Sequence, residues 1–233
     1  MNAIVEATGL RKIYREGGDS QLEVLSHVDI AIAPGEVVAI VGASGAGKST
    51  LLHLLGALDA PTAGEIRLDG IAYGDLDEAG RDTLRNRKLG FVFQFHHLLR
   101  EFSAVENVMM PLLVAGWPPE RARGRAEELL AQVDIAGRMT HRPPELSGGE
   151  QQRCAVARAV VHDPRVLLAD EPSGNLDRLN SLRLNDLLFG LARKLETALV
   201  VVTHNPSLAE RADRILRLAN GRLEPIDSPG VFS

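Results

Sequence analysis

A run of small residues with one lysine has the spacing G-x-x-x-x-G-K-[ST] of a phosphate-binding loop. Its residues are Gly42, Ala43, Ser44, Gly45, Ala46, Gly47, Lys48 and Ser49. Glycines let the backbone curve closely, so that successive N–H groups and the start of the next helix point at the β-phosphate. Lys48 would reach the β- and γ-phosphates, Ser49 would offer a hydroxyl to Mg²⁺, and Thr50 would lie near the α-phosphate. The pattern predicts a bound nucleoside triphosphate.

Two carboxylates at the end of an apolar strand form a second chemical group. The strand is Val166 to Ala169, and Asp170 and Glu171 follow it directly. Asp170 would hold Mg²⁺ through its water shell, and Glu171 is placed to act as general base on a water that attacks the γ-phosphate. Taken alone, the pair is also compatible with solvated acids at a strand end. Beside a phosphate loop, it favours hydrolysis of the triphosphate.

A third group lies in the segment 146–153, LSGGEQQR. Ser147 and Glu150 have the spacing of a capping box, and Gly148 and Gly149 leave the first N–H groups of the helix open to an anion. This spacing predicts a second phosphate site. A nucleotide has one γ-phosphate, so two such sites in one chain indicate that two chains enclose each nucleotide. A well-capped helix with one face in the core fits the same residues.

The hydrophobic pattern indicates the elements that hold these groups. Continuous apolar runs at 37–41, 166–169 and 199–202 are typical of strands buried on both faces of a parallel sheet. Alternating apolar residues over 28–32 predict a small antiparallel element. The fold class is therefore α/β.

The stretch between the two strand regions has a helical pattern. We expect helices over Ser103–Val114 and Pro119–Val133, and a third from Ser147 onward. The chain is expected to form a single domain over 1–233, with an α/β core over 1–93 and 164–233 and an inserted helical subdomain over 94–163.

Composition restricts the class of protein. The 233 residues carry a net charge of -5, which gives no overall attraction for nucleic acid, and no apolar run approaches the length of a membrane span. Cys154 is the single cysteine, so no internal disulfide can form. The first ten residues lack the pattern of a signal peptide. We expect a cytoplasmic protein that reaches a membrane only through a partner.

Together, these motifs resemble the ATP-binding subunits of ABC transporters along essentially the whole chain. The resemblance implies a P-loop cassette with a RecA-like parallel core, which binds ATP and Mg²⁺ and hydrolyses ATP. It also implies a head-to-tail dimer, in which Ser147, Gly148, Gly149 and Glu150 of one copy cover the ATP held by Lys48 of the other.

The resemblance adds residues that the motifs above do not contain. It implies that Tyr14 stacks on adenine, that Gln94 senses Mg²⁺ and the membrane partner, and that His204 contacts the γ-phosphate. It also assigns the loop 173–177, SGNLD, to the dimer contact. Taken alone, Tyr14 would fit a half-buried strand, and His204 would fit an ordinary loop.

Within the family, the stretches 90–108 and 141–147 are similar to the lipoprotein-releasing subgroup. That similarity implies integral membrane subunits of the LolC and LolE type, on the cytoplasmic face of the bacterial inner membrane. Arg100 stands where the subgroup usually has proline, and Asn205 stands where it usually has aspartate.

Other functions remain open at this point. ATPases of macrolide-export and cell-division complexes share the loop 174–177. The acidic net charge disfavours a soluble cassette that acts on DNA or the ribosome. The presence of Glu171 and His204 disfavours a regulator that does not hydrolyse ATP. The pair His96 and His97 could suggest a metal site, but no further ligands with suitable spacing accompany it. Contact with a membrane subunit is favoured, and an exposed loop fits the same residues.

Overall fold

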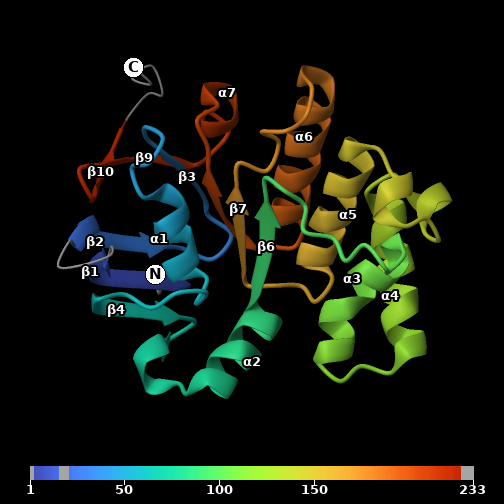
Figure 1. Ribbon diagram of the computed structural model, residues 1–233, viewed down its shortest axis with the longest axis horizontal. Helices are drawn as coiled ribbons and strands as arrows, with labels where there is room; N and C mark the ends of the chain where they lie inside the picture. The colour runs from blue at the N-terminus through green and yellow to red at the C-terminus, as the bar shows by residue number, and fades with distance from the viewer. Residues whose placement is uncertain (1–2, 16–20, 227–233) are drawn as a thin grey trace. The chain divides into compact units, whose positions relative to one another are not determined.

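The structure, a computed structural model, describes residues 3–15 and 21–226 (Figure 1). It divides into two compact units, residues 1–82 with 198–233 and residues 83–197. The helical subdomain predicted over 94–163 falls within the second unit, and its own boundaries stay a prediction.

The first unit contains a four-stranded antiparallel sheet in the order β2-β1-β4-β5. Its strands are β1 (Val5–Arg15), β2 (Gln21–Ile32), β4 (Ala63–Leu68) and β5 (Ile71–Ala72). In β2, Val28, Ile30 and Ile32 are buried and the residues between them are exposed. This alternation confirms the predicted antiparallel element, because successive side chains of a strand point to opposite faces.

Parallel strands in the same unit hold the phosphate loop. The strand β3 (Val37–Val41) pairs in parallel with β8 (Ala198–Val202) and β9 (Arg214–Ala219), and β10 (Arg222–Pro225) runs antiparallel to β9. All residues of β3 and β8 are buried, as their apolar runs predicted. The helices α1 (Lys48–Leu55) and α7 (Pro206–Ala209) follow them. The loops after β3 and β8 therefore emerge at the carboxyl ends of neighbouring strands, where nucleotide-facing loops collect.

A parallel strand pair also carries the carboxylates of the second unit. The helix α2 (Glu78–Lys88) leads into β6 (Leu89–Phe93), which pairs with β7 (Val166–Asp170). The register runs from Leu89 opposite Val166 to Phe93 opposite Asp170. Gln94 and Glu171 therefore follow adjacent strand ends.

The other helices of the second unit are α3 (Ala104–Val114), α4 (Pro119–Gln132), α5 (Gly148–Val160) and α6 (Arg178–Lys194). The predicted helices are confirmed, with Ser103 and Ser147 as N-caps. The helix α5 packs against α3, α4, α6 and β6, and its middle is buried. Short 3₁₀ turns lie at Ala136–Arg138 and Pro143–Glu145 in this unit and at Tyr73–Asp75 in the first unit. No helix in the described part of the chain is long and apolar enough to cross a membrane.

Candidate functional site

The loop between β3 and α1 has a shape that depends on its glycines. Gly45 and Gly47 have φ angles of +78° and +97°, which residues with a side chain rarely adopt. A Cβ on Gly47 would lie 2.7 Å from a methyl group of Val24, and one on Gly42 would overlap the main-chain oxygen of Leu218. The backbone can therefore curve as a phosphate cradle only with glycine at these positions.

Lys48 lies within the curve of this loop. Its Nζ donates hydrogen bonds to the main-chain oxygens of Gly42 and Ala43, both at 2.9 Å. Ser49 and Thr50 follow in the first turn of α1. The loop thus holds a cation beside the open N–H groups of a helix start, an arrangement that suits an anion.

Tyr14 reaches the same helix from β1. Its hydroxyl donates to Oδ2 of Asp59 at 2.9 Å and also hydrogen-bonds to Thr50. Burial raises the pKa of Tyr14, and so does the hydrogen bond that its hydroxyl donates to Asp59. The Nζ of Lys12 lies 4.8 Å from the centre of the tyrosine ring and donates to Asp59 at 2.7 Å. The ring is fixed at its hydroxyl and covered by a cation, while 36% of the residue stays exposed.

Asp59 is the junction of this small network. Burial raises the pKa of Asp59, but hydrogen bonds from Lys12 and Tyr14 outweigh it and hold the pKa below its usual value. The carboxylate therefore stays charged and can accept both bonds at neutral pH. Sequence reasoning missed Asp59, which lies 45 positions from Tyr14. The nearness of Lys12 to Tyr14 could have been predicted, because residues two positions apart in a strand lie on the same face.

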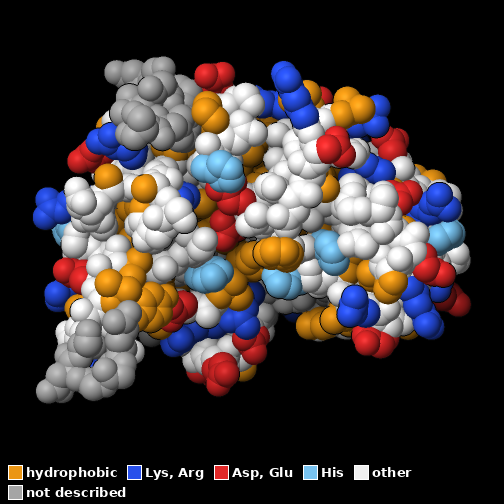
Figure 2. Space-filling view, turned by 45° about the horizontal axis from the view of Figure 1, so that its top comes forward, with side chains coloured by type: hydrophobic (Ala, Val, Ile, Leu, Met, Phe, Trp, Pro, Cys, Tyr) orange, Lys and Arg blue, Asp and Glu red, His pale blue; other side chains and the backbone are white. Residues whose placement is uncertain are grey.

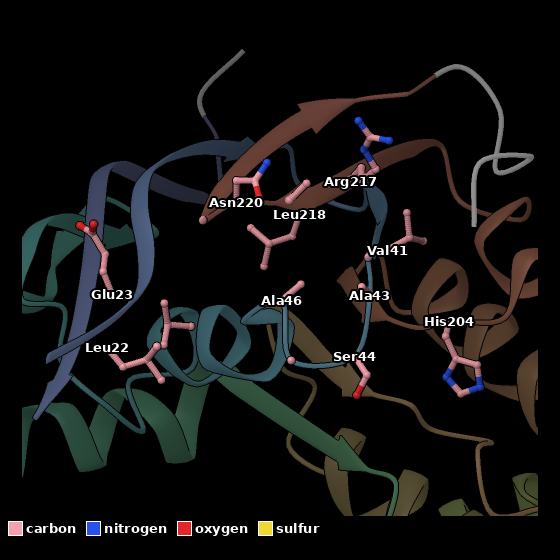
Figure 3. A pocket seen from close by; sticks show the side chains of 15 residues that line it. Leu22, Glu23, Val41, Ala43, Ser44, Ala46, His204, Arg217, Leu218 and Asn220 are labelled. Carbon is pink, nitrogen blue, oxygen red and sulfur yellow. The ribbon is translucent and has the colours of Figure 1, made fainter. Parts of the chain in front are cut away.

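His204 and the phosphate loop line the same cleft. The cleft has a volume of about 870 Å³, and Gly42 to Ala46, His204 and the turn between β9 and β10 line it. Figure 3 shows the His204 side chain on the side of the loop where Ser44 projects. The following Asn205 accepts bonds from the N–H and hydroxyl of Ser207, at 3.0 and 2.8 Å, and caps α7. The departure from aspartate at this position therefore keeps a capping oxygen.

The second unit brings Gln94, Asp170 and Glu171 to the ends of β6 and β7. Glu171 has a φ of +44°, an uncommon conformation for a residue with a side chain. Such backbone outliers are concentrated at functional sites, where the surrounding structure enforces them. Gly174 donates its N–H to the main-chain oxygen of Glu171 at 3.0 Å, which closes a tight turn after the carboxylate.

Two amide side chains connect the segments that follow β6 and β7. Gln152 is 3% exposed, and its Nε2 donates to the main-chain oxygens of Phe93 and Pro172 at 2.7 and 2.8 Å. Asn175 makes two hydrogen bonds with Gln94, one to its side chain and one to its main chain. Sequence reasoning missed these connections, because nothing local in the sequence relates residues 81 positions apart.

The residues of the segment 147–150 form a separate group at the N-terminus of α5. Oε2 of Glu150 accepts bonds from the N–H and hydroxyl of Ser147 at 2.8 and 2.7 Å, which confirms the capping box. Oε1 of Glu150 accepts from Arg138 at 3.1 Å. The hydrogen bonds from Ser147 and then Arg138 lower the pKa of Glu150 to about 2. A Cβ on Gly149 would approach Asn180 to 3.4 Å, so the helix start is close to α6.

An exposed apolar group follows Gln94. Phe95, Leu99 and Phe102 are 65%, 41% and 38% exposed, a larger share than packing in a closed core would leave. Arg158 on α5 donates to the main-chain oxygens of His97 and His96, both at 2.8 Å, and holds the segment in place. Figure 2 shows hydrophobic side chains beside histidines on the face that it presents. This group has the character of a docking surface.

The candidate metal ligands are oxygen donors. They are the hydroxyl of Ser49, the amide oxygen of Gln94 and the carboxylate of Asp170, and such hard oxygen ligands suit Mg²⁺. No group of three or more His, Cys, Asp or Glu that could hold a metal occurs in residues 3–15 and 21–226. Ser49 belongs to the first unit and Gln94 and Asp170 to the second, and each offers the kind of oxygen that Mg²⁺ accepts beside nucleotide phosphates.

Known proteins are similar to this chain over most of its length. A family model described as "ABC transporter" matches residues 25–174. Curated relatives named lipoprotein-releasing system ATP-binding protein LolD are 54% identical in Bordetella pertussis, 53% in Xanthomonas campestris and 52% in Legionella pneumophila. These matches cover 95%, 98% and 94% of this chain, and 95%, 95% and 96% of the respective relatives.

A solved structure is similar over nearly the same length. The ATP-binding cassette MJ0796, determined as a dimer with ADP and Pi in a post-hydrolysis state, is 38% identical to this chain. The two superpose with a TM-score of 0.87 over 94% of this chain and 96% of the other. The chain therefore belongs to the ABC transporter family, of which it forms an ATP-binding cassette.

Proposed function

We propose that this chain is the ATP-hydrolysing subunit of a lipoprotein-releasing complex, which moves lipoproteins from the inner membrane to a periplasmic carrier. One observation carries the proposal: identity of 52–54% to LolD proteins of several bacteria extends over nearly the full length of both chains. The stretches that follow β6 and precede α5 belong to this similarity.

ATP binding would begin at the loop between β3 and α1. The ammonium of Lys48, now bonded to the oxygens of Gly42 and Ala43, would exchange these partners for β- and γ-phosphate oxygens. The loop N–H groups would receive the β-phosphate. Tyr14 offers adenine the ring face opposite Lys12, while Asp59 and Thr50 hold its hydroxyl.

Ser49, Gln94 and Asp170 would hold Mg²⁺ together with the phosphates. The ion would neutralise charge on the β- and γ-phosphates as the bond between them breaks. Asp170 ends β7 opposite Phe93, so the register of the strand pair fixes it one position from Gln94. Two of the three proposed ligands thus lie at the ends of paired strands, and Ser49 lies in the first turn of α1.

Glu171 would accept the proton of the attacking water, and His204 would donate a hydrogen bond to the γ-phosphate. The tight turn at Gly174 and the positive φ of Glu171 support the first role, because they fix the backbone that carries the carboxylate at the strand end. The shared cleft of His204 and the phosphate loop supports the second.

A second copy of the chain would complete each ATP site. Ser147, Gly148, Gly149 and Glu150 of one copy would cover the ATP bound by Lys48 of the other. The dimeric, ADP-bound structure of MJ0796 supports this arrangement. The capping box supports it too, because it fixes the start of α5 while leaving Ser147 exposed.

LolC/LolE-like integral membrane subunits would dock on the apolar group at Phe95, Leu99 and Phe102, on the cytoplasmic face of the inner membrane. The exposure of these aromatic and aliphatic side chains supports this. The hydrogen bonds of Arg158 to the main-chain oxygens of His96 and His97 support it too, because they hold the adjacent segment in place. Aromatic side chains in such positions are typical anchors of protein interfaces.

Copurification tests this proposal. The Glu171→Gln variant is expressed in Gram-negative cells, membranes are extracted in mild detergent with ATP, and associated proteins are identified by mass spectrometry. We expect a LolC/LolE-like pair with bound lipoprotein. Recovery of a macrolide-export or cell-division membrane protein instead would transfer the same chemistry to a sister system and reject the proposed substrate.

A further inference from the structure

The side chains of Gln94 and Asn175 hold each other by two hydrogen bonds. Nε2 of Gln94 donates to Oδ1 of Asn175 at 2.9 Å, and Nδ2 of Asn175 donates to the main-chain oxygen of Gln94 at 3.1 Å. Gln94 follows β6, and Asn175 lies in the loop after β7. The pair therefore links the candidate metal ligand to the loop 173–177.

The second of these bonds determines how both amides are oriented. A main-chain oxygen can only accept, so the end of Asn175 that faces it must be the NH₂ group. The opposite end of Asn175 is then an oxygen, which requires a donor from Gln94. Gln94 must present its NH₂ group to Asn175, and its Oε1 is left on the far side of Cδ. That oxygen is the atom a metal ion would require.

Gly174 gives an independent sign that this position of Gln94 is built into the loop. A Cβ on Gly174 would lie 3.1 Å from Nε2 of Gln94 and 3.4 Å from its Cδ, closer than ordinary contacts. The φ of Gly174 is not in the left-handed region, so the backbone itself does not require glycine. A side chain at position 174 would instead crowd the amide of Gln94.

The main chain on both sides of the pair is already fixed. Gln152 bonds to the main-chain oxygens of Phe93 and Pro172, and the register of β6 and β7 sets their ends side by side. The remaining freedom lies in the torsions of the Gln94 side chain. Asn175 and Gly174 act on those torsions.

We propose that Asn175 and Gly174 are positioning residues, which present the amide oxygen of Gln94 to the metal ion bound with ATP. The inference rests on the proposed function, because it requires Gln94 to be a metal ligand. It assigns a role in metal binding to a loop that the family resemblance connects only with the dimer contact.

A double-mutant cycle tests the inference. ATP binding is measured by calorimetry with Mg²⁺ and with EDTA, in the Glu171→Gln background, for Asn175→Ala, Gln94→Ala and the double variant. We expect Asn175→Ala to lower the Mg²⁺-dependent part of the affinity roughly 3- to 10-fold, as expected for a lost hydrogen bond. Affinity in EDTA should not change, and the double variant should match Gln94→Ala.

A second cycle replaces Asn175→Ala by Gly174→Ala. Its added Cβ should weaken Mg²⁺-dependent binding when Gln94 is present and have no effect beside Gln94→Ala, where the crowded amide is gone. The matched control is Gln132→Ala, which removes another exposed carboxamide of the same unit. It should bind as the parent does.

Three outcomes would overturn the inference: unchanged Mg²⁺ dependence in Asn175→Ala, additive losses in the double variants, or an equal loss of affinity in EDTA. The failure of the proposed function has a different signature, in which the parent protein does not bind ATP. If Gln94→Ala alone has no Mg²⁺ effect while ATP still binds, the positioning role is rejected and ATP binding stands.

Discussion

Glu171 has the most unusual backbone of the residues with proposed catalytic roles. Glu171 directly follows the buried strand β7 and has a φ of +44°. Its main-chain oxygen accepts a hydrogen bond from the N–H of Gly174, which closes the turn. These contacts involve the backbone, so a change of side chain from carboxylate to amide leaves them intact. The positive φ and the tight turn are therefore expected to persist in a Glu171→Gln variant.

We expect Glu171→Gln to bind ATP as the wild type does and to hydrolyse it roughly 10²- to 10⁴-fold more slowly, because a positioned general base is lost. Phosphate release and ATP binding are measured on the same preparation. Wild-type turnover in this variant would contradict the proposed role.

Glu150 makes stability depend on pH. Its pKa is about 2 in the folded protein and about 4.3 in an unfolded chain. A lowered carboxyl pKa stabilises the fold fully above the unfolded value, and this contribution declines as pH falls toward the folded value.

The expected result is that wild type is more stable than Glu150→Gln at pH 7 and that the difference shrinks at pH 3.5. Glutamine keeps the spacing of the capping box without the charge. Urea unfolding of both proteins at the two pH values measures this. A difference that stays constant or grows at acidic pH would contradict the assigned ionisation.

At the scale of elements, the buried side chain of Gln152 connects the ends of β6 and β7. Its Nε2 satisfies two main-chain oxygens, those of Phe93 and Pro172. Leucine has a similar size but cannot donate, so both oxygens would lose the hydrogen bond from Gln152, and the bond to Pro172 is buried.

Gln152→Leu should lower the free energy of unfolding by about 2 to 4 kcal/mol. The control, Gln132→Leu on the exposed side of α4, should stay within about 0.5 kcal/mol of wild type. Chemical denaturation measures both. Equal stability of Gln152→Leu and wild type would show that the two segments are held by other contacts.

Elements and motifs could be predicted from the sequence because their signals are local. Ser147 and Glu150 are three positions apart, and the apolar run at 37–41 needs no partner to be seen as a buried strand. The hydrogen bonds of Asp59 to Tyr14 and of Asn175 to Gln94 could not be predicted, because they join residues 45 and 81 positions apart. Only the folded sheets bring such residues together.

At the scale of the whole molecule, function is proposed to depend on closure of two copies around ATP. Ser147 is exposed at the start of α5 and would face the ATP of the other copy. A large cation there would block closure while leaving the phosphate loop of its own chain unchanged.

Ser147→Arg in the Glu171→Gln background should therefore bind ATP and stay monomeric, whereas Glu171→Gln alone should dimerise with ATP. Sedimentation equilibrium with and without ATP distinguishes the two states. An ATP-dependent dimer of the Ser147→Arg variant would reject the proposed position of this helix start.

Release of lipoprotein from a membrane tests the central claim most directly. The chain is reconstituted with LolC/LolE-type subunits in vesicles that contain a lipoprotein, and lipoprotein transferred to a soluble periplasmic carrier is measured after ATP is added. We predict ATP-dependent transfer, which Glu171→Gln and Lys48→Ala both abolish. ATP hydrolysis by the assembled complex without any transfer of lipoprotein would contradict the account.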